Sequence, residues 1–249
     1  MSNKFQKIVV VGASRGIGAA VAEHLISRTR ELIAVSRSPA SFGDWIQADI
    51  SNKAGIKAIG DRVGNSPLDA FLYMGGTWES DAFTNKYSFA NCSEEEIENV
   101  IAVNLLAPIL LVKSLLPALR QADNPKILFM GALSGLDKFP AREVANSASL
   151  LAHSLAPFGD AGSLVKFGLR GAVHALREEL RPDRIAVTII NSGNIATPEV
   201  LNDLQQAGKP ATNAIPLSDL LCVIDCVLSL SRSTCIKEIQ LPTMNATGA

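Results

Sequence analysis

The chain is poor in the residues that build metal centres and disulfide frameworks. Its 249 residues include only four cysteines and three histidines, which form no CxxC pair and no cluster with metal-ligand spacing. This excludes a zinc ribbon and a disulfide scaffold and favours a reducing setting. Cys222 and Cys226 lie four residues apart in a predicted helix, where we expect small buried hydrophobes.

Clustered basic residues and long apolar runs are also missing. The net charge is −1 with no Lys/Arg cluster, so no nucleic-acid partner is predicted. The most apolar stretch, residues 101–119, is interrupted by two prolines, an asparagine and a lysine, which argues against a membrane span. Residues 1–5 lack the apolar core of a signal peptide. We therefore expect a cytoplasmic protein with no membrane partner.

Apolar runs alternate with helical patterns along nearly the whole chain. Strands are predicted for Ile8–Val11, Leu32–Val35, Trp45–Ala48, Ala70–Met74, Ile127–Met130, Ile185–Ile190 and Glu238–Leu241. Helices are predicted for Ala19–Arg28, Ala54–Val63, Glu94–Leu119, Leu164–Leu180 and Leu217–Leu230. Repeated βα units predict an α/β fold, a single doubly wound domain over residues 1–249 whose parallel sheet has about seven strands and helices on both faces.

Two segments break the alternation. Residues 136–162 are rich in Ser, Ala and Pro and unusually long for a loop in a compact domain, which favours an active-site insertion. Residues 199–215 are polar and contain Gly208-Lys209-Pro210, a composition that suits a mobile substrate lid or a passive surface loop.

A glycine-rich turn, Gly12-Ala13-Ser14-Arg15-Gly16-Ile17-Gly18, stands between the first strand and the first helix. Glycines let the backbone turn sharply and approach a phosphate closely. The helix N-terminus then offers free N–H groups and the positive end of its dipole. The turn therefore predicts a dinucleotide site.

Three more predicted strands end in residues that suit the adenosine half of a dinucleotide. Ser36-Arg37 follows the second strand, where an acid would hold ribose hydroxyls and repel a 2′-phosphate. Serine removes that repulsion, and Arg37 and Arg15 can clamp the phosphate, so NADPH is favoured over NADH. Asp49-Ile50 and Met74-Gly75-Gly76 follow the next two strands, where the carboxylate can accept from the adenine amine, Ile50 can flank the ring, and the glycines can admit the adenosine.

With these motifs the chain resembles the short-chain dehydrogenase/reductase family over nearly its whole length. Its TGxxxGxG turn, D-[VIL] pair and NNAG motif would correspond to residues 11–18, 49–50 and 73–76. Its helix asparagine would be Asn104, and its late PGxxxT motif would be Ser192-Gly193-Asn194-Ile195-Ala196-Thr197. The resemblance implies that Ser192, Gly193, Ile195 and Thr197 meet the cofactor, although Thr197 also suits a helix N-cap before Pro198.

The chain differs from the family at the positions of the residues that donate the proton during carbonyl reduction. The family's Ser-Tyr-Lys set would place the lysine at Lys166, but Gly162 stands where its tyrosine belongs. Ala132 occupies the serine position, and Ser134 is the nearest hydroxyl. The only tyrosines, Tyr73 and Tyr87, lie far upstream. The resemblance implies that Lys166 bonds the ribose and that Asn104 holds the lysine or a water.

Three functions fit this pattern. Hydride addition to the β-carbon of an α,β-unsaturated carbonyl gives a weakly basic enolate that needs no strong acid, as in the similar tyrosine-lacking reductases of the bacilysin and aeruginosin pathways. Ordinary carbonyl reduction would need a substitute acid from residues 136–162, such as His153, Ser154 or Asp160. A non-catalytic NADPH-binding sensor needs neither. We favour the first.

Substrate and assembly are less constrained by the sequence. Trp78, Phe83, Tyr87 and Phe89 follow the fourth strand and can wall an apolar substrate pocket or pack as local core. A small-molecule substrate is expected, and no metal. The predicted helices 94–119 and 164–180 pack subunits together in the family, which implies a homodimer or homotetramer.

Overall fold

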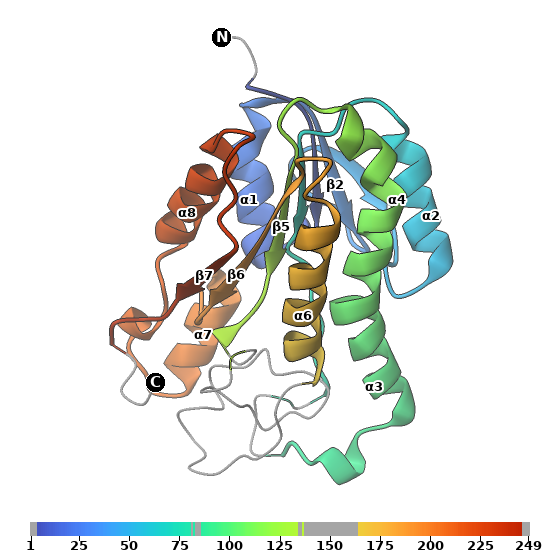
Figure 1. The fold of residues 1–249 in the computed structure, drawn as a ribbon. Helices are drawn as coiled ribbons and strands as arrows, with labels where there is room; N and C mark the ends of the chain where they lie inside the picture. The colour runs from blue at the N-terminus through green and yellow to red at the C-terminus, as the bar shows by residue number, and fades with distance from the viewer. Residues whose placement is uncertain (1–3, 81, 83–85, 134–135, 137–163, 246–249) are drawn as a thin grey trace.

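A seven-stranded parallel sheet forms the centre of the molecule (Figure 1). The computed structural model describes residues 4–80, 82, 86–133, 136 and 164–245. The strand order is β3-β2-β1-β4-β5-β6-β7. The strands are β1 (Phe5–Val11), β2 (Thr29–Ser36), β3 (Asp44–Gln47), β4 (Ala70–Tyr73), β5 (Lys126–Met130), β6 (Ala186–Ser192) and β7 (Glu238–Leu241). The predicted fold class is confirmed.

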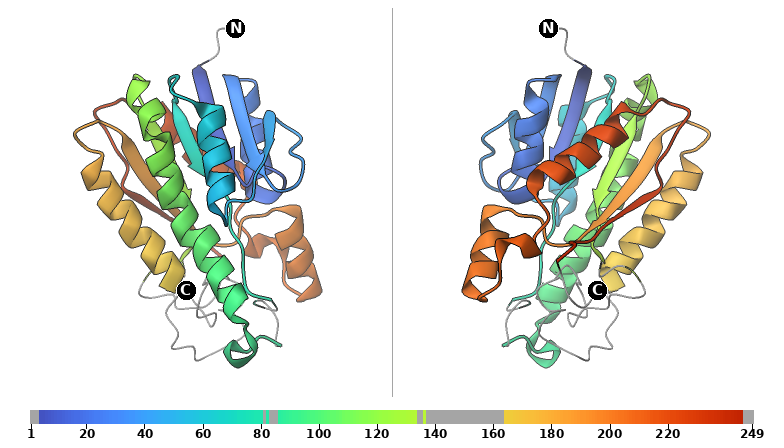
Figure 2. Two further views of the ribbon diagram at one scale, coloured as in Figure 1. Left: turned by 90° about the vertical axis from the view of Figure 1, so that its right-hand side faces the viewer. Right: turned by 90° about the vertical axis from the view of Figure 1, so that its left-hand side faces the viewer.

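Helices cover both faces of this sheet (Figures 1 and 2). One face carries α2 (Lys53–Val63), α4 (Ala107–Gln121) and α6 (Leu164–Glu179), and the other carries α1 (Gly16–Ile26) and α8 (Leu217–Ser229). The remaining described helices are α3 (Glu94–Ile101), α7 (Pro198–Gln206), the π segment Ala102–Leu106 and the 3-10 turns Phe89–Asn91 and Ala211–Asn213.

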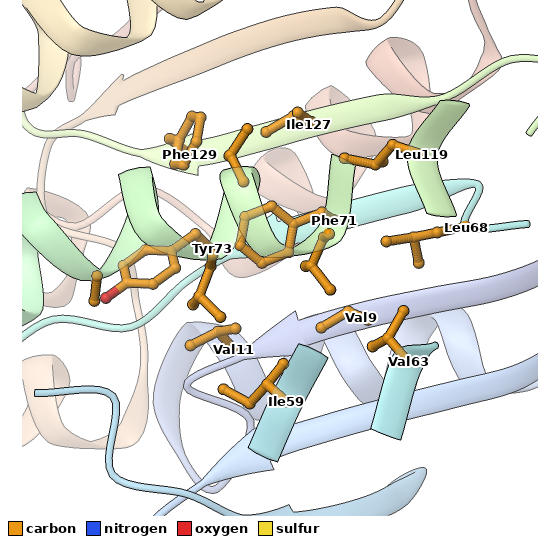
Figure 3. Packing of buried hydrophobic residues seen from close by; sticks show 14 of the residues in the cluster. Val9, Val11, Ile59, Val63, Leu68, Phe71, Tyr73, Leu119, Ile127 and Phe129 are labelled. Atoms are coloured by element: carbon orange, nitrogen blue, oxygen red, sulfur yellow. The ribbon is translucent and has the colours of Figure 1, made fainter. Parts of the chain in front are cut away.

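The central strands are apolar because both of their faces are buried. In β1, Val9 and Val11 face the α2/α4/α6 layer, whereas Ile8 and Val10 face α1 and α8. Phe71 packs edge-on against Tyr73 and Phe129, with ring centroids 6.3 and 6.2 Å apart (Figure 3). These rings form the core under the carboxyl half of β4 and β5.

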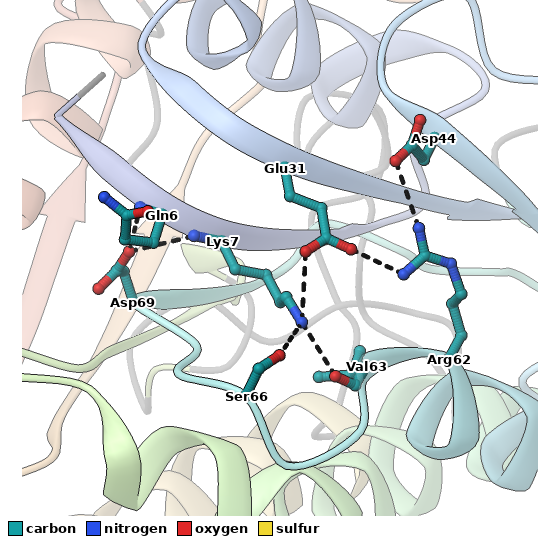
Figure 4. Close-up of polar contacts among 8 residues, drawn as sticks. All are labelled: Gln6, Lys7, Glu31, Asp44, Arg62, Val63, Ser66 and Asp69. Atoms are coloured by element: carbon teal, nitrogen blue, oxygen red, sulfur yellow. Dashed lines mark hydrogen bonds and ion pairs between the residues drawn. The ribbon is translucent and has the colours of Figure 1, made fainter. Parts of the chain in front are cut away.

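The amino ends of the first strands are joined by charged groups rather than apolar ones (Figure 4). Lys7 is buried, and its Nζ donates to the Val63 carbonyl at 3.0 Å and pairs with Glu31 at 3.3 Å. Arg62 of α2 pairs with Glu31 at 2.7 Å and with Asp44 at 3.3 Å. The network connects β1, β2 and β3 to α2 near the amino ends of the strands. Since ligands bind at the carboxyl ends of such strands, we assign this network a role in stability rather than in binding.

One long helix corrects the expectation that residues 101–119 are too interrupted to span a membrane. Residues Glu94–Gln121 form one helix, with Pro117 inside it, that is long and apolar enough to cross a membrane. Of its most apolar 18 residues, 44% are buried, and Leu111, Leu115 and Leu119 are almost fully covered. A helix that packs in the core of a protein can have the same length and composition.

Two further expectations change. Cys222 and Cys226 are exposed rather than buried, because α8 turns Leu220, Ile224 and Val227 toward the sheet instead. Within residues 199–215, where the sequence suggested a loop or lid, most of the first half forms α7. The insertion at 136–162 lies outside the described residues, apart from Leu136.

Candidate functional site

The glycine turn lies at the carboxyl ends of β1 and β4, where the strand order reverses direction. Open parallel sheets bind ligands in a crevice at this point, and we use that name for this part of the molecule. Gly12 has a φ of +85°, and a Cβ built on it would lie 2.8 Å from the Cα and N of Gly75. A Cβ on Gly18 would lie 2.1 Å from the Gly12 carbonyl oxygen. The two motifs after β1 and β4 therefore touch backbone to backbone, as only glycine allows.

The start of α1 can receive an anion. Arg15 is its N-cap residue, and no side chain caps the helix there. The first N–H groups of α1 therefore face the crevice uncapped, with the helix dipole behind them. This arrangement fits the pyrophosphate of a dinucleotide.

The late motif lies against the same turn. A Cβ built on Gly16 would lie 3.9 Å from Cγ2 of Thr197. Thr197 is buried and its hydroxyl accepts from the Val200 N–H at 3.4 Å, so it is the N-cap of α7. Ser192 and Ile195 are also buried, and the Gly193 N–H donates to the Leu241 carbonyl at 2.8 Å.

The segment after β2, which the sequence predicts to face the adenosine, lies beside the glycine turn, because the Gly12 N–H donates to the Val35 carbonyl at 2.9 Å. Ser36 is buried, and its hydroxyl donates to the Ser38 carbonyl at 2.6 Å. Arg37 and Arg15 are both exposed. Neither Ser36 nor Arg37 carries a negative charge that would repel a 2′-phosphate.

Asp49 and Ile50 follow β3 at this end. The Ser51 N–H donates to the Asp49 carboxylate at 3.0 Å and lowers the pKa of that carboxyl, and the charge of Arg37 acts in the same direction. Ile50 is partly buried, and a Cβ on Gly75 would lie 3.6 Å from its Cδ1. Met74, directly before Gly75, packs partly against the α1/α8 layer.

Asn104 fixes the segment that follows β4. It lies in the π segment, is buried, donates from Nδ2 to the Thr77 carbonyl at 2.7 Å, and accepts the Thr77 N–H on Oδ1 at 3.0 Å. A Cβ on Gly76 would lie 3.3 Å from this Oδ1. The Asn104 amide thus forms both of these hydrogen bonds with the Thr77 backbone, whereas the sequence predicted that Asn104 holds the lysine or a water.

Lys166 lies in the first turn of α6 and is 7% exposed. Burial lowers the pKa of its ammonium to about 8. The charged form of a buried lysine is stabilised when an anionic or hydroxyl-bearing ligand accepts hydrogen bonds from its ammonium group.

A partly buried polar network that the sequence did not predict joins β6, β7 and α6. Glu238 of β7 accepts from Asn191 Nδ2 at 2.6 Å and from Arg170 Nε at 2.8 Å, with His174 3.4 Å away. A Cβ on Gly131 would lie 2.0 Å from Asn191 Oδ1. The network thus joins α6, one turn after Lys166, to the backbone beside Ala132 and Ser192. An asparagine inside an apolar strand was the only available signal.

Both tyrosines of the chain lie among the described residues, and neither is exposed. The Tyr73 hydroxyl is buried and donates to the Val103 carbonyl, and burial raises its pKa. Tyr87 is buried too, and Ala132 is 5% exposed. Gly162, Ser134, His153, Ser154, Asp160 and Phe83 lie outside the described residues. Of the expected aromatic wall, Trp78 and Phe89 are exposed and Tyr87 is not.

Comparisons with known proteins agree on a single family. The model of the short chain dehydrogenase family matches residues 6–207. The ketoacyl reductase HetN of Nostoc sp. is 24% identical over 204 residues, 76% of this chain and 63% of its own length. The 3-dehydrosphinganine reductase TSC10B of Arabidopsis thaliana is 24% identical over 82% of this chain and 59% of its own.

A solved structure shares the fold. A metagenomic short-chain oxidoreductase in complex with NADP superimposes with a TM-score of 0.69 at 24% identity, covering 96% of this chain and 98% of its own. The chain spans about three fifths of the two curated relatives named above. On the family match and the shared architecture, this chain belongs to the short chain dehydrogenase family.

Proposed function

We propose that the protein is an NADPH-dependent reductase that adds hydride to the conjugated C=C bond of an enal or enone in natural-product biosynthesis. The proposal is supported by the spacing of the family's motifs, which would place Gly162 and Ala132 at the tyrosine and serine positions. It is also supported by the Tyr73 hydroxyl, which is buried and donates to the Val103 carbonyl.

The crevice residues divide the cofactor among them. Gly12, Ser14, Gly16, Ile17 and Gly18 would hold the pyrophosphate, and Arg15 and Arg37 the 2′-phosphate. The adenosine would lie among Ser36, Asp49, Ile50, Met74, Gly75 and Gly76, and the nicotinamide half near Asn104, Lys166, Ser192, Gly193, Ile195 and Thr197. When bound, such a cofactor supplies the hydride.

The chain's own groups then need to orient rather than protonate. General acid catalysis contributes about a hundred- to ten-thousand-fold, a loss that would cripple carbonyl reduction, where an alkoxide forms. An enolate is far less basic, and water can protonate its carbon. Lys166 would hold the ribose hydroxyls, and Asn104 would fix the Gly76-Thr77 backbone that borders the reacting groups.

Carbonyl reduction is the second candidate. It is favoured by the names of two relatives, a ketoacyl reductase and a 3-dehydrosphinganine reductase. This function would require a substitute acid from residues 136–162. His153, Ser154 and Asp160 are the side chains in that segment that we would substitute first.

Incubation with NADPH and a matched pair of acceptors separates these functions. The enal and the saturated aldehyde of the same carbon skeleton are offered, and products are identified by mass and NMR. Conjugate reduction predicts the saturated aldehyde from the enal and no turnover of the saturated aldehyde. Alcohol from the saturated aldehyde would overturn it, and no NADPH oxidation with any acceptor would favour a binding protein.

We also propose a homodimer or homotetramer in the cytoplasm, acting on a small molecule. The helix pair α4/α6 leaves apolar surface outside the core, and Leu106 at its start is 48% exposed. Light scattering after size exclusion tests this; a monomer at micromolar concentration would contradict it.

A further inference from the structure

We propose that Trp45 determines the preference for NADPH by fixing the turn that carries Arg37. This inference rests on the proposed use of NADPH. Trp45 lies on the edge strand β3, nine residues beyond Ser36, and is 38% exposed. The N–H of a partly buried tryptophan usually has a hydrogen-bond partner.

The indole N–H is used, and its partner is Ser36. Nε1 of Trp45 lies 3.1 Å from the Ser36 hydroxyl and 3.3 Å from the Ser36 carbonyl oxygen. The same hydroxyl donates to the Ser38 carbonyl at 2.6 Å. The three groups form a continuous relay from indole N–H to hydroxyl to carbonyl, in which each hydrogen bond strengthens the next.

This relay determines which group can recognise a phosphate. A serine hydroxyl has one proton, and that of Ser36 is given to Ser38, so the hydroxyl has no donor left for an anion. Recognition then falls to Arg37, whose guanidinium carries five donors and a permanent charge. Ser36 contributes by lacking a carboxylate and by holding the backbone on either side of Arg37.

Hydrogen bonds from both sides hold the backbone of the turn, whereas the Arg37 side chain is exposed. On the β3 side, Gln47 Nε2 donates to the Arg37 carbonyl at 3.3 Å, and the Ala48 N–H donates to the Ser36 carbonyl at 3.1 Å. On the β1 side, the N–H groups of Gly12 and Ala13 donate to the Val35 carbonyl at 2.9 and 3.2 Å. The phosphate-binding turn and the Arg37 turn therefore share one backbone framework.

Removal of the indole N–H should loosen only the side of this framework that faces a 2′-phosphate. Trp45→Phe keeps an aromatic ring but removes the N–H that the Ser36 hydroxyl and carbonyl accept. We expect the affinities for NADP⁺ and for adenosine 2′,5′-bisphosphate to fall about three- to tenfold, the effect of one hydrogen bond. The affinities for NAD⁺ and 5′-AMP, which lack the 2′-phosphate, should stay within about twofold. Gln47→Leu should give a smaller change of the same kind.

The test is calorimetric titration of the four ligands into wild type, Trp45→Phe and a control. Asp44→Asn is the matched control, since Asp44 lies on the same strand and contacts Arg62 rather than the turn. It should leave all four affinities unchanged. Melting temperatures of each variant show whether the fold is intact.

A double-mutant cycle with Arg37→Ala shows whether Trp45 acts through Arg37. We expect Trp45→Phe to have no further effect on NADP⁺ binding once Arg37 is alanine. The inference is overturned if Trp45→Phe weakens all four ligands equally, if it changes none, or if its effect persists in the Arg37→Ala background. A wild-type protein that binds NAD⁺ as tightly as NADP⁺ would overturn the NADPH assignment itself, which a failure at Trp45 alone would not.

Discussion

The side chain of Asn104 pairs with the backbone of Thr77 through both amide atoms, at 2.7 and 3.0 Å. This pairing holds the chain after β4 against the π segment, where the Tyr73 hydroxyl also donates to the Val103 carbonyl. The aromatic core and the segment after β4 thus meet at one π segment, a helical irregularity of a kind that is frequent at functional sites.

Asn104→Asp should damage both stability and cofactor binding. A carboxylate can accept the Thr77 N–H but cannot donate to its carbonyl, which stays buried without that bond. We expect a loss of about 1–3 kcal/mol in the free energy of unfolding by urea, and weaker NADPH binding. Asn124→Asp is the control, because Asn124 donates to the Leu230 carbonyl elsewhere. Equal effects of both variants on NADPH affinity would argue against a role for Asn104 in the site.

Glu238→Gln should flatten the acid dependence of stability. Burial opposes its charge, but the hydrogen bond and charge of Arg170, with His174, hold the pKa of Glu238 below its usual value. A carboxyl whose pKa is lower in the folded than in the unfolded state stabilises the fold at pH values above the unfolded-state pKa. That stabilisation is lost as the pH falls through the folded-state pKa. Glu238→Gln should cost about 1–3 kcal/mol at pH 7 and less at pH 4. A cost that does not change between these pH values in urea melts would contradict this.

NADPH affinity should fall as pH rises past about 8, the value to which burial lowers the pKa of Lys166. The charged ammonium donates strong hydrogen bonds to the ribose hydroxyls, and the neutral amine above that pH donates weaker ones. Lys166→Arg should bind NADPH with an affinity that stays level to pH 10, because a guanidinium stays charged. Fluorescence titrations from pH 6.5 to 10 measure this. A wild-type profile as flat as that of the arginine variant would contradict the role given to Lys166.

Gly12→Ala should abolish tight cofactor binding. The added Cβ would meet Gly75 backbone at 2.8 Å, at a φ of +85° that alanine rarely adopts. We expect a loss of about 1–3 kcal/mol in stability and at least about tenfold in NADPH affinity. Gly171→Ala, on α6 with nothing within 4 Å of its Cβ, should bind normally and gain up to about 1 kcal/mol. Tight binding by Gly12→Ala would show that the crevice lies elsewhere.

The sequence predicted the sheet well because burial on both faces makes its central strands continuously apolar. All seven predicted strands overlap strands of the structure. The glycine turn was equally predictable, because its requirements are local. Gly12 and Gly16 have a positive φ, and a Cβ on Gly18 would clash with the Gly12 carbonyl.

What the sequence could not predict depends on contacts between distant residues. Glu238 meets Asn191 and Arg170 only because β7 adds beside β6 and under α6. In the sequence, Trp45 is an ordinary strand residue. Its hydrogen bond to Ser36 could not be predicted, because it depends on the pairing of β3 with β2. The exposure of Cys222 and Cys226 likewise depends on which face of α8 meets the sheet.

The proposed function has hydride adding to the β-carbon of the conjugated C=C bond, whereas carbonyl reduction would add it to the carbonyl carbon and form an alkoxide that needs an acid. The most direct measurement uses NADPH deuterated at C4 of the nicotinamide on each face in turn, with an enal as the only acceptor, and locates the deuterium in the product by NMR. We predict deuterium on the β-carbon of a saturated aldehyde. Deuterium on the carbinol carbon of an allylic alcohol would contradict the claim.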